Sequence, residues 1–425
     1  MSTSFNTISM IGLGYIGLPT AAMLASRKLK VIGVDINQHA VDTINKGQIH
    51  IVEPELDMIV SAAVSQGYLR ATTKPEAADA FLIAVPTPFK GDHEPDISFV
   101  ESAAKSIAPV LRRGNLVILE STSPVGTTEQ MAEWLAEARP DLSFPQQKGE
   151  DADINIAYCP ERVLPGKVVH ELVNNDRVIG GMTARCSQRA ISLYKTFVEA
   201  ECIETNARTA EMCKLTENSF RDVNIAFANE LSIICEKLGI NVWELVKLAN
   251  RHPRVNILQP GPGVGGHCIA VDPWFIVAKT PNEAKLIRAA REVNDGKPHW
   301  VLDKVKVAVA EYLQQNPDKT AKDVTIACFG LAFKPDIDDL RESPSLEITI
   351  ELAKQHPGPV LAVEPNIDQL PSALPTNVKL VSAEDAQMSS KVAVILVAHK
   401  NFRILPLSSW ASLDVVDTCG LGVAS

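Results

Sequence analysis

The chain has 425 residues, of which 46% are apolar and 22% are charged, and its formal net charge at pH 7 is −10. This length predicts two or three domains with large buried cores. Proteins that bind nucleic acid or an anionic membrane usually carry a basic surface, so the negative charge argues against both kinds of partner. The N-terminal residues do not resemble a signal peptide, and the longest apolar run, at 392–398, is too short to cross a bilayer. We therefore expect a cytoplasmic protein.

Residues 1–205 alternate apolar, strand-like runs with helix-like segments. The runs TISMI, LKVIGVDIN, AFLIAVPTP and LVILESTSP are typical of strands, whereas TAAMLASRK is typical of a helix. Strands that alternate with helices predict a parallel sheet covered on both faces. We expect a doubly wound, Rossmann-like α/β domain over this segment.

The first predicted strand runs into a glycine turn of the form G-x-G-x-x-G. Such glycines let the backbone approach a pyrophosphate at the N-terminus of the following helix. Asp35 ends the next strand, where an acid accepts hydrogen bonds from a ribose and would repel the extra phosphate of NADP. The alternative is an ordinary turn with a solvated acid. The residues expected to bind NAD here are Gly12, Gly14, Tyr15, Ile16, Gly17 and Asp35.

Two later loops, VPTP at 85–88 and STSPVGTT at 121–128, follow other strands of the same predicted sheet. Ligands in such folds bind beyond the carboxyl ends of the strands. Thr87 and Thr128 are therefore candidates for contacts with the cofactor. For any single residue in these loops, an ordinary turn rich in Pro, Ser and Thr is an equally good interpretation.

The pattern becomes helical at about residue 207, and we expect an all-helical middle domain at 206–312. Lys214, Asn218 and Arg221 are spaced i, i+4 and i+7, so they share one helix face. By itself this face could be plain solvated surface. A chain with net charge −10 that binds an anionic nucleotide, however, needs cations gathered in one place.

A polar linker, QQNPDKTAKD, precedes a second α/β region at 320–425. VTIACFG, GPVLAVEP, KVAVILVAH and LDVVDTCG are typical of strands, and SLEITIELAKQ of a helix. The expected architecture is therefore two Rossmann-like doubly wound domains joined by a central domain of long helices.

One loop, PGPGVGGHCIAVDPW at 260–274, places four glycines and two prolines just before Cys268 and Asp272. None of the eight cysteines forms a C-x-x-C pair, and only Cys268 lies in a glycine loop. A thiolate can add to an aldehyde, and oxidation of the resulting thiohemiacetal leaves a thioester that water cleaves. Loop amides and Lys214 could favour the thiolate. Cys268 is thus predicted to be a nucleophile.

Six distinctive segments follow one another along nearly the full length of the chain: GLGYIGLP, ESTSPVG, CPERVLPG, EMCKLTENSFRDVNIAFANE, GPGVGGHCIAVDP and FGLAFKPDIDDLRESP. Together they resemble the UDP-glucose/GDP-mannose dehydrogenase family. The resemblance implies oxidation of a nucleotide-sugar C6 hydroxymethyl group to a carboxylate with two NAD. The segment at 250–275 is most similar to the UDP-N-acetyl-D-mannosamine branch of the family. That branch implies a role in bacterial surface polysaccharide biosynthesis, such as that of enterobacterial common antigen.

The same resemblance assigns the catalytic roles. Cys268 would be the nucleophile. Lys214 and Asp272 would transfer protons, and Lys214 with Asn218 would stabilise the developing oxyanion.

Glu161 and Thr122 would position the water that hydrolyses the thioester, again by resemblance. Arg341 would contact NAD. His252 and Arg254 are similar to residues that reach the sugar bound by a neighbouring subunit, which implies a homodimer built on the central helices. The residues expected to bind the UDP-sugar are Arg162, Val163, Lys214, Asn218, Arg221, His252, Arg254, Gly265, Phe333 and Lys334.

One position departs from the family pattern. Cys419 stands where the family has Arg or Lys, two residues after the aspartate of the last strand, so nucleotide-sugar binding should be weaker unless another residue replaces it. Three alternatives stay open: another UDP-sugar, such as UDP-N-acetylglucosamine or UDP-glucose; a two-electron hydroxyacid dehydrogenase in which Cys268 only packs; and a nucleotide sensor without turnover. No metal ligand is assigned.

Overall fold

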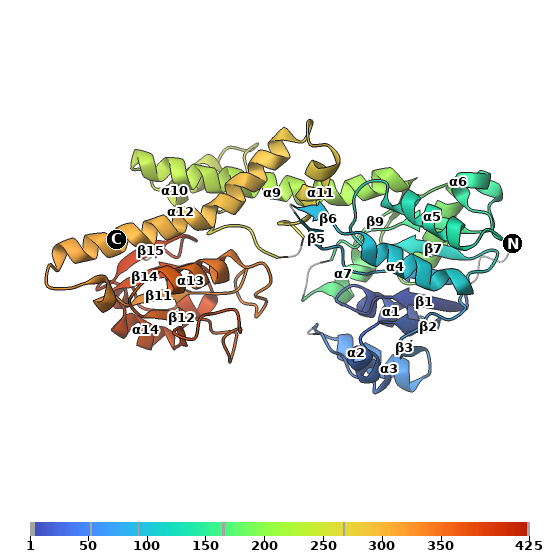
Figure 1. Ribbon diagram of the computed structural model, residues 1–425, viewed down its shortest axis with the longest axis horizontal. Coiled ribbons are helices and arrows are strands. Elements are labelled where there is room, and N and C mark those ends of the chain that lie inside the picture. The colour runs from blue at the N-terminus through green and yellow to red at the C-terminus, as the bar shows by residue number, and fades with distance from the viewer. Residues whose placement is uncertain (1–4, 52, 92, 164–165, 267, 423–425) are drawn as a thin grey trace. The chain divides into compact units, whose positions relative to one another are not determined.

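The computed structural model of the protein describes residues 5–51, 53–91, 93–163, 166–266 and 268–422. The chain divides into two compact units, residues 1–217 and 218–425, which are described separately. The division falls inside one long helix, α9 (Ala207–Leu238). Figure 1 follows the chain from its blue to its red end.

The first unit is built on a sheet with the strand order β10-β9-β8-β7-β4-β1-β2-β3. Its central strands are apolar and buried, as expected for strands covered on both faces. The strands are β1 (Thr7–Ile11), β2 (Lys30–Val34), β3 (Leu69–Thr72), β4 (Ala80–Ile83), β7 (Leu116–Leu119), β8 (Asn155–Tyr158), β9 (Arg177–Gly181) and β10 (Cys202–Asn206), and β5 (Phe89–Lys90) pairs with β6 (Glu94–Pro95) in a separate hairpin.

One pairing in this sheet differs from the expected parallel arrangement. β8 and β9 pair antiparallel, whereas the other neighbours pair parallel. A run of buried apolar residues predicts a strand but carries no signal for its direction, which depends on how the intervening chain returns.

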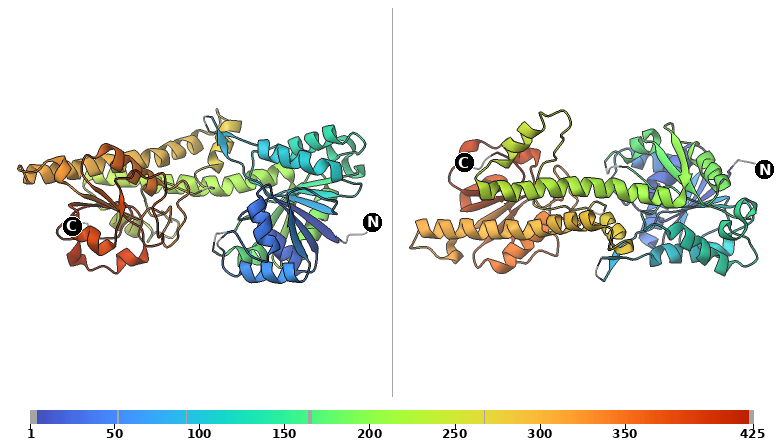
Figure 2. Two further views of the ribbon diagram at one scale, coloured as in Figure 1. Left: turned by 60° about the horizontal axis from the view of Figure 1, so that its bottom comes forward. Right: turned by 90° about the horizontal axis from the view of Figure 1, so that it is seen from above.

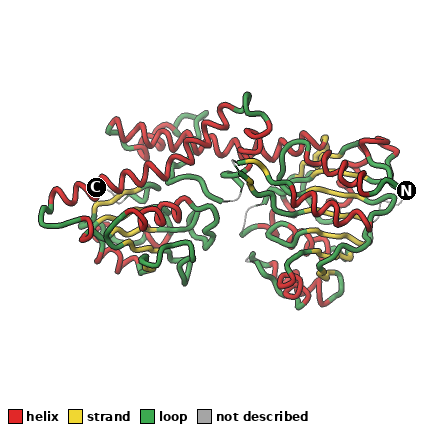
Figure 3. The backbone as a smooth tube through the Cα atoms, viewed as in Figure 1, coloured by secondary structure: helices red, strands yellow, loops and turns green. Residues whose placement is uncertain are grey.

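Helices cover both faces of the first sheet, as Figure 3 shows by the red coils on either side of the yellow strands. Leu18 of α1, Val60 of α3 and Leu193 of α8 belong to the core on one face, and Val100 of α4 and Met131 of α5 to the core on the other. The helices are α1 (Gly17–Ser26), α2 (Gln38–Asn45), α3 (Leu56–Ser65), α4 (Ser98–Ile107), α5 (Thr127–Ala138), α6 (Pro145–Lys148), α7 (Val168–Asn174) and α8 (Ala184–Tyr194), with 3₁₀ turns η1 (Ala108–Val110) and η2 (Gly149–Asp151).

Long helices form the first part of the second unit. α9 is followed by α10 (Val242–Ala249), α11 (Asp272–Lys279) and α12 (Lys285–Gln315), which continues through Pro298. α9 and α12 lie side by side, as the right view of Figure 2 shows, and the Asn229 side-chain amide donates to that of Asn294 at 2.9 Å. The sequence predicted helices after the glycine loop, and the structure gives them as α11 and one continuous helix of 31 residues.

A parallel sheet with the order β13-β12-β11-β14-β15 forms the rest of the second unit. Val301 of α12 and Leu352 of α13 pack on one face, and Phe402 and Trp410 on the other. The elements are β11 (Ile326–Phe329), α13 (Pro344–Gln355), β12 (Val360–Val363), β13 (Lys379–Leu380), α14 (Ala383–Ser389), β14 (Val392–Ile395), α15 (Lys400–Arg403) and β15 (Asp414–Asp417), with 3₁₀ turns η3 (Ala321–Asp323) and η4 (Leu407–Ser409).

The two sheets share one local arrangement. Gly12, after β1, has φ +90° and its N–H donates to the carbonyl of Val34 at the end of β2, at 2.8 Å. Gly330, after β11, has φ +95° and donates in the same way to Val363 at the end of β12, also at 2.8 Å. In each case the residue after the second strand is an acid, Asp35 or Glu364.

These two α/β parts and the helices between them confirm the predicted fold class. The predicted domain limits at 205, 312 and 320 stay predictions. Among the described helices, none combines the length and the apolar character that a membrane crossing requires.

Candidate active site

The glycine turn after β1 is closed on two sides and open on the third. A Cβ at Gly12 would lie 2.4 Å from the carbonyl oxygen of Ala84, and a Cβ at Gly17 would lie 1.8 Å from that of Gly12. A Cβ at Gly14 would meet no atom within 4 Å. Gly14 therefore faces free space at the N-terminal end of α1, where a pyrophosphate can approach the backbone. The residues present fit a dinucleotide.

Asp35 is fixed beside this turn. Its Oδ2 accepts the N–H of Leu13 and its Oδ1 accepts the N–H of Asn37, both at 2.8 Å. Each carboxylate oxygen has a second lone pair, so Asp35 can still accept ribose hydroxyls. Tyr15, which is 39% exposed, and the half-buried Ile16 complete the turn.

The predicted threonines have partners inside the first unit. The hydroxyl of Thr87 donates to the carbonyl of Thr122 at 2.6 Å, which ties the two loops together. The N–H and the hydroxyl of Thr128 donate to Glu211 at 2.8 and 2.6 Å, and Gly126 N–H donates to the same carboxyl group at 2.6 Å. Burial raises the pKa of Glu211, and its place at the N-terminal end of α5 suits a carboxylate. A contact of Thr128 with the cofactor stays a prediction.

The segment after β8 brings Glu161 and Arg162 into two ion pairs of the first unit. Glu161 is buried and pairs with Arg177 at 2.9 Å. Arg162 is half-buried and pairs with Glu217 of α9 at 2.6 Å. Val163, which is also half-buried, packs against the core beneath the segment.

In the second unit, Cys268 lies exposed just before α11. Its carbonyl accepts the N–H of Asp272, the first residue of that helix, at 2.9 Å. The buried Asp272 carboxylate in turn accepts the side-chain amide of Asn218 at 2.5 Å. The structure therefore brings Cys268, Asp272 and Asn218 together, and a helix N-terminus nearby favours negative charge.

The glycine loop packs against the loop that follows β11. A Cβ at Gly265 would lie 2.4 Å from the carbonyl oxygen of Glu342 and 2.8 Å from Cβ of Phe333. The N–H of Gly266 donates to the carbonyl of Arg341 at 3.3 Å. The glycines thus allow close packing between two segments that the resemblance assigns to the UDP-sugar site. His267 lies outside the described residues.

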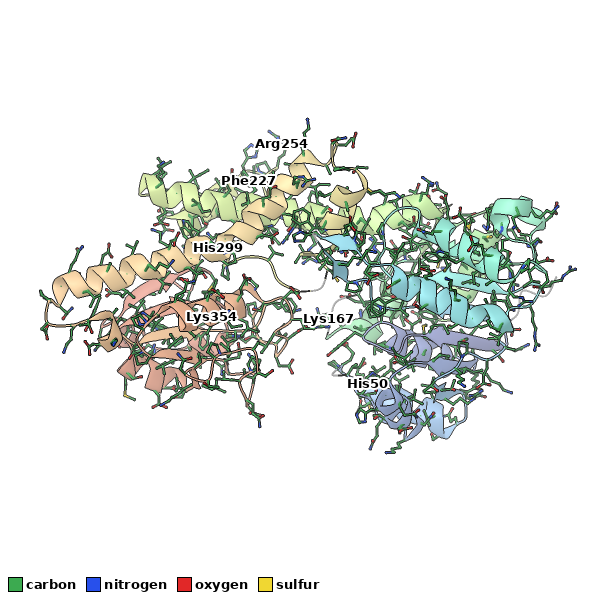
Figure 4. The ribbon with its side chains drawn as sticks, in the orientation of Figure 1. His50, Lys167, Phe227, Arg254, His299 and Lys354 are labelled. Carbon is green, nitrogen blue, oxygen red and sulfur yellow. The ribbon has the colours of Figure 1, made fainter. Side chains whose placement is uncertain are left out.

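Other predicted residues lie at the surface of their units. On α9, Lys214 is half-buried and Arg221 is exposed. His252 and Arg254 are exposed after α10, and Figure 4 labels Arg254 and Phe227 in this helical part of the second unit. Their contacts with a substrate stay predictions.

Two cations and one cysteine lie in the C-terminal part. The Arg341 guanidinium donates to the Asp339 carboxylate at 2.6 to 3.1 Å. Lys334 Nζ lies 5.7 Å from the centre of the Phe333 ring. Cys419 is half-buried, and its thiol contacts the carbonyl of Ile395 at 3.7 Å, so it is packed against β14. Burial raises the pKa of this thiol.

Two residues that the sequence did not indicate form hydrogen bonds or ion pairs with predicted site residues. Arg177 pairs with Glu161, and Glu211 binds the N–H and hydroxyl of Thr128. Both are buried charged side chains in otherwise ordinary strand or helix sequence. A charge at a position where the pattern predicts burial is the signal that could have found them.

Comparison with known proteins identifies the family. The NAD binding domain of the UDP-glucose/GDP-mannose dehydrogenase family matches residues 6–198, its central domain 208–296 and its UDP binding domain 327–419. The chain belongs to this family. Membership makes the protein an NAD-dependent oxidoreductase with a UDP-sugar substrate, which confirms the predicted cofactor and enzyme class.

Curated relatives cover nearly the whole chain. The UDP-N-acetyl-D-mannosamine dehydrogenase of Yersinia pestis is 70% identical over 98% of this chain and 99% of its own length. That of Escherichia coli K12 is 68% identical over the same shares. The NDP-N-acetyl-D-galactosaminuronic acid dehydrogenase of Ralstonia solanacearum is 65% identical over 98% of this chain and 96% of its own.

Solved structures have the same fold. UDP-D-ManNAc dehydrogenase from Pyrococcus horikoshii superposes with a TM-score of 0.85 at 37% identity, over 98% of this chain and 96% of that one. UDP-N-acetyl-mannosamine dehydrogenase from Staphylococcus aureus gives 0.81 at 42% identity, over 99% and 96%.

Proposed function

We propose that the protein oxidises C6 of UDP-N-acetyl-D-mannosamine to the carboxylate, giving UDP-N-acetyl-D-mannosaminuronate, with Cys268 as the covalent nucleophile. The observation that carries the chemistry is an exposed cysteine whose loop leads into a buried Asp272, itself bonded to Asn218 at 2.5 Å. The substrate rests on the relatives that are 68–70% identical over almost the full length.

The first oxidation needs a base for the C6 hydroxyl proton and donors for the developing negative oxygen. Lys214 and Asp272 serve as the proton-transferring groups, and Asn218 donates to the oxygen. Bound NAD accepts one hydride in each of the two oxidations, so two molecules are used per sugar.

The second oxidation needs covalent attachment, because an aldehyde has no hydride to give until a nucleophile adds. The Cys268 thiolate adds to the aldehyde carbon, the oxygen takes a proton, and the thiohemiacetal C–H becomes available. Loss of hydride and of the hydroxyl proton leaves a thioester on Cys268. Glu161 and Thr122 position the water that cleaves it to the carboxylate and the free thiol.

The proposed assembly is a homodimer formed through the central helices. The exposed apolar side chains of α9 follow a spacing of seven and then four residues, so they share one face: Phe220, Phe227, Ile234 and Leu238. A monomer rarely leaves such a stripe in water. His252 and Arg254 then reach the site of the neighbouring subunit. All eight cysteines are free thiols, which suits the proposed cytoplasmic location, and surface polysaccharide synthesis is the proposed pathway.

The test is the ratio of NADH to sugar acid formed from UDP-N-acetyl-D-mannosamine. We expect a ratio of two for the natural protein, and loss of net acid formation in Cys268→Ser. A Cys268→Ser enzyme that still released carboxylate at the normal rate with two NADH would refute the nucleophile.

A second candidate substrate is an N-acetylgalactosamine-type nucleotide sugar, which the 65% identical Ralstonia relative favours. The same assay with the mannosamine, glucosamine and galactosamine sugars separates them by kcat/KM. Highest efficiency with another sugar would overturn the substrate and leave the chemistry intact.

A further inference from the structure

A cluster of polar side chains lies buried where three strands of the first sheet end or begin. Glu120 follows β7, Cys159 and Glu161 follow β8, Arg177 begins β9 and Tyr194 ends α8. All five residues are buried. Buried acids and arginines are rare unless they are paired, so the arrangement calls for a reason.

Arg177 is the centre of the cluster. Its Nη2 donates to Glu161 Oε2 at 2.9 Å, and its Nη1 approaches the sulfur of Cys159 at 3.8 Å. The guanidinium carbon lies 4.7 Å from the centre of the Tyr194 ring and 5.4 Å from that of Phe197. Two aromatic faces and an ion pair confine a planar guanidinium to one orientation.

The Glu161 carboxylate is consequently held from both sides. Oε2 accepts from Arg177 at 2.9 Å, and Oε1 accepts the N–H of Arg162 at 2.7 Å. Each oxygen keeps a further lone pair, so the carboxylate can bind a water while the protein fixes its orientation.

We propose that Arg177 is a positioning residue for thioester hydrolysis, which fixes the Glu161 carboxylate in the direction from which it orients the attacking water. This inference rests on the proposed function, in which Glu161 acts on that water. The Arg177 side chain is buried, so in this proposal it acts through Glu161 and not by contacting substrate or cofactor.

Under this proposal, Arg177 affects thioester hydrolysis and neither of the two hydride transfers. In hydrolysis the water oxygen bonds to the thioester carbon, the C–S bond breaks, and the products are the carboxylate, the Cys268 thiol and one proton. The two hydride transfers use Lys214, Asp272 and Cys268 instead. Loss of Arg177 should therefore slow only the last step, and the thioester should accumulate on Cys268.

The experiment follows a single turnover of Arg177→Met with NAD and UDP-N-acetyl-D-mannosamine. Two NADH should form per site in a burst at the natural rate. Hydrolysis should then be about tenfold to a hundredfold slower, the range that follows from a displaced catalytic group. Intact-mass spectra should show the sugar thioester on most of the enzyme, as in Glu161→Gln. Arg177→Lys keeps the charge without the second donor, and should accumulate less thioester than Arg177→Met.

Arg139→Met is the matched control. Arg139 lies in the same unit and donates to Asp141 and to the carbonyls of Ala108 and Leu111, so its removal loosens the unit elsewhere. It should lower thermal stability without any thioester on Cys268. If Arg177 were merely structural, its variants would resemble this control, with all steps reduced together in proportion to unfolded enzyme.

Two failures can be told apart. If the natural enzyme does not form two NADH per sugar, the proposed function is wrong and this inference falls with it. If it does, and Glu161→Gln traps the thioester while Arg177→Met and Arg177→Lys do not, the inference alone is overturned. Should Arg177→Met not fold, Arg177→Lys decides the question.

Discussion

Asn218 and Asp272 form a buried contact between α9 and the start of α11, at 2.5 Å. The Asn218 amide orients the Asp272 carboxylate, and Cys268 lies four residues before Asp272 in the chain. We therefore expect Asn218 to have two roles, positioning Asp272 and stabilising negative charge on the reacting oxygen.

Asn218→Ala should lower kcat by about 10²- to 10³-fold, the usual loss of one oxyanion donor, with a smaller change in KM. Steady-state NADH formation measures both constants. Asn224→Ala is the control, because Asn224 lies on the same helix and its side-chain amide donates to the carbonyl of Phe220. Equal losses in the two variants would mean that the effect comes from α9 as a whole.

Glu120 gives a prediction about stability and pH. Burial raises its pKa from 4.5 to about 7, against the lowering effects of the Tyr194 hydrogen bond and the Arg177 charge. The folded state therefore keeps a proton that the unfolded state releases between these values, and stability falls as the pH rises through this window.

The free energy of unfolding should drop by on the order of 3 kcal/mol between pH 4.5 and pH 8 relative to Glu120→Gln, in which nothing titrates at this position. Urea unfolding of both proteins at several pH values measures the difference. Parallel curves for the two proteins would show that Glu120 is not the group responsible.

Candidate site residues could be predicted from the sequence where they belong to a motif. Partners that depend on burial in the folded protein could not. The spacing of Lys214 and Asn218 on one helix face followed from the sequence. The partner of Glu161 did not, because Arg177 lies some sixteen residues away and only tertiary packing of β8 against β9 brings the two together. The partner of a charged residue in a buried strand is therefore known only once the tertiary structure is known.

At the scale of elements, the backbone of the glycine loop is constrained by the loop that follows β11. It passes so close to the loop after β11 that a side chain at Gly265 would overlap Glu342 and Phe333, while one at Gly261 would meet nothing nearer than 3.9 Å. The two glycines lie in one loop but have different steric surroundings.

Gly265→Ala should raise KM for the UDP-sugar at least tenfold, because the two loops would have to separate where the substrate is expected to bind. Gly261→Ala should leave KM close to natural. Kinetics for both variants, with circular dichroism to confirm folding, test the contrast. Similar KM values for the two would exclude a role for the close approach.

Most elements were predictable, since β1, β2, β4 and β7 and their helices follow from apolar runs and turn residues. Strand direction was not: β9 reverses against β8 although its residues are as apolar as those of a parallel strand. Pro298 also suggests a helix end, yet α12 passes through it, because packing of Val301 and Val305 in the core outweighs one missing backbone donor.

At the scale of the whole molecule, the apolar stripe on α9 is the feature that predicts an assembly. Phe227 is 53% exposed and lies in the middle of the stripe between Phe220 and Ile234. An aspartate there would place a charge in the proposed dimer contact.

Phe227→Asp should shift the protein from dimer to monomer at micromolar concentration and reduce activity with it, because His252 and Arg254 would no longer reach a second site. Analytical ultracentrifugation measures the shift. Met388→Asp, which changes an even more exposed apolar side chain on α14, should remain dimeric. A Phe227→Asp dimer of natural stability would place the contact elsewhere.

Each sheet has an acid after its second strand, Asp35 after β2 and Glu364 after β12, but the surroundings of the two acids differ. Glu364 is 3% exposed, its Oε2 accepts the N–H groups of Leu331 and Ala332, and the His399 ring lies 3.0 Å from it. The Nδ1 of His399 accepts the N–H of Asp336, so Nε2 carries the proton and donates it to Glu364. Asp35 accepts the backbone N–H groups of Leu13 and Asn37 and keeps contact with solvent. The two sheets thus carry an acid at the same position, but Glu364 is buried and Asp35 is partly exposed, so we expect the adenosine ribose of NAD to be recognised at the first sheet and not at the second.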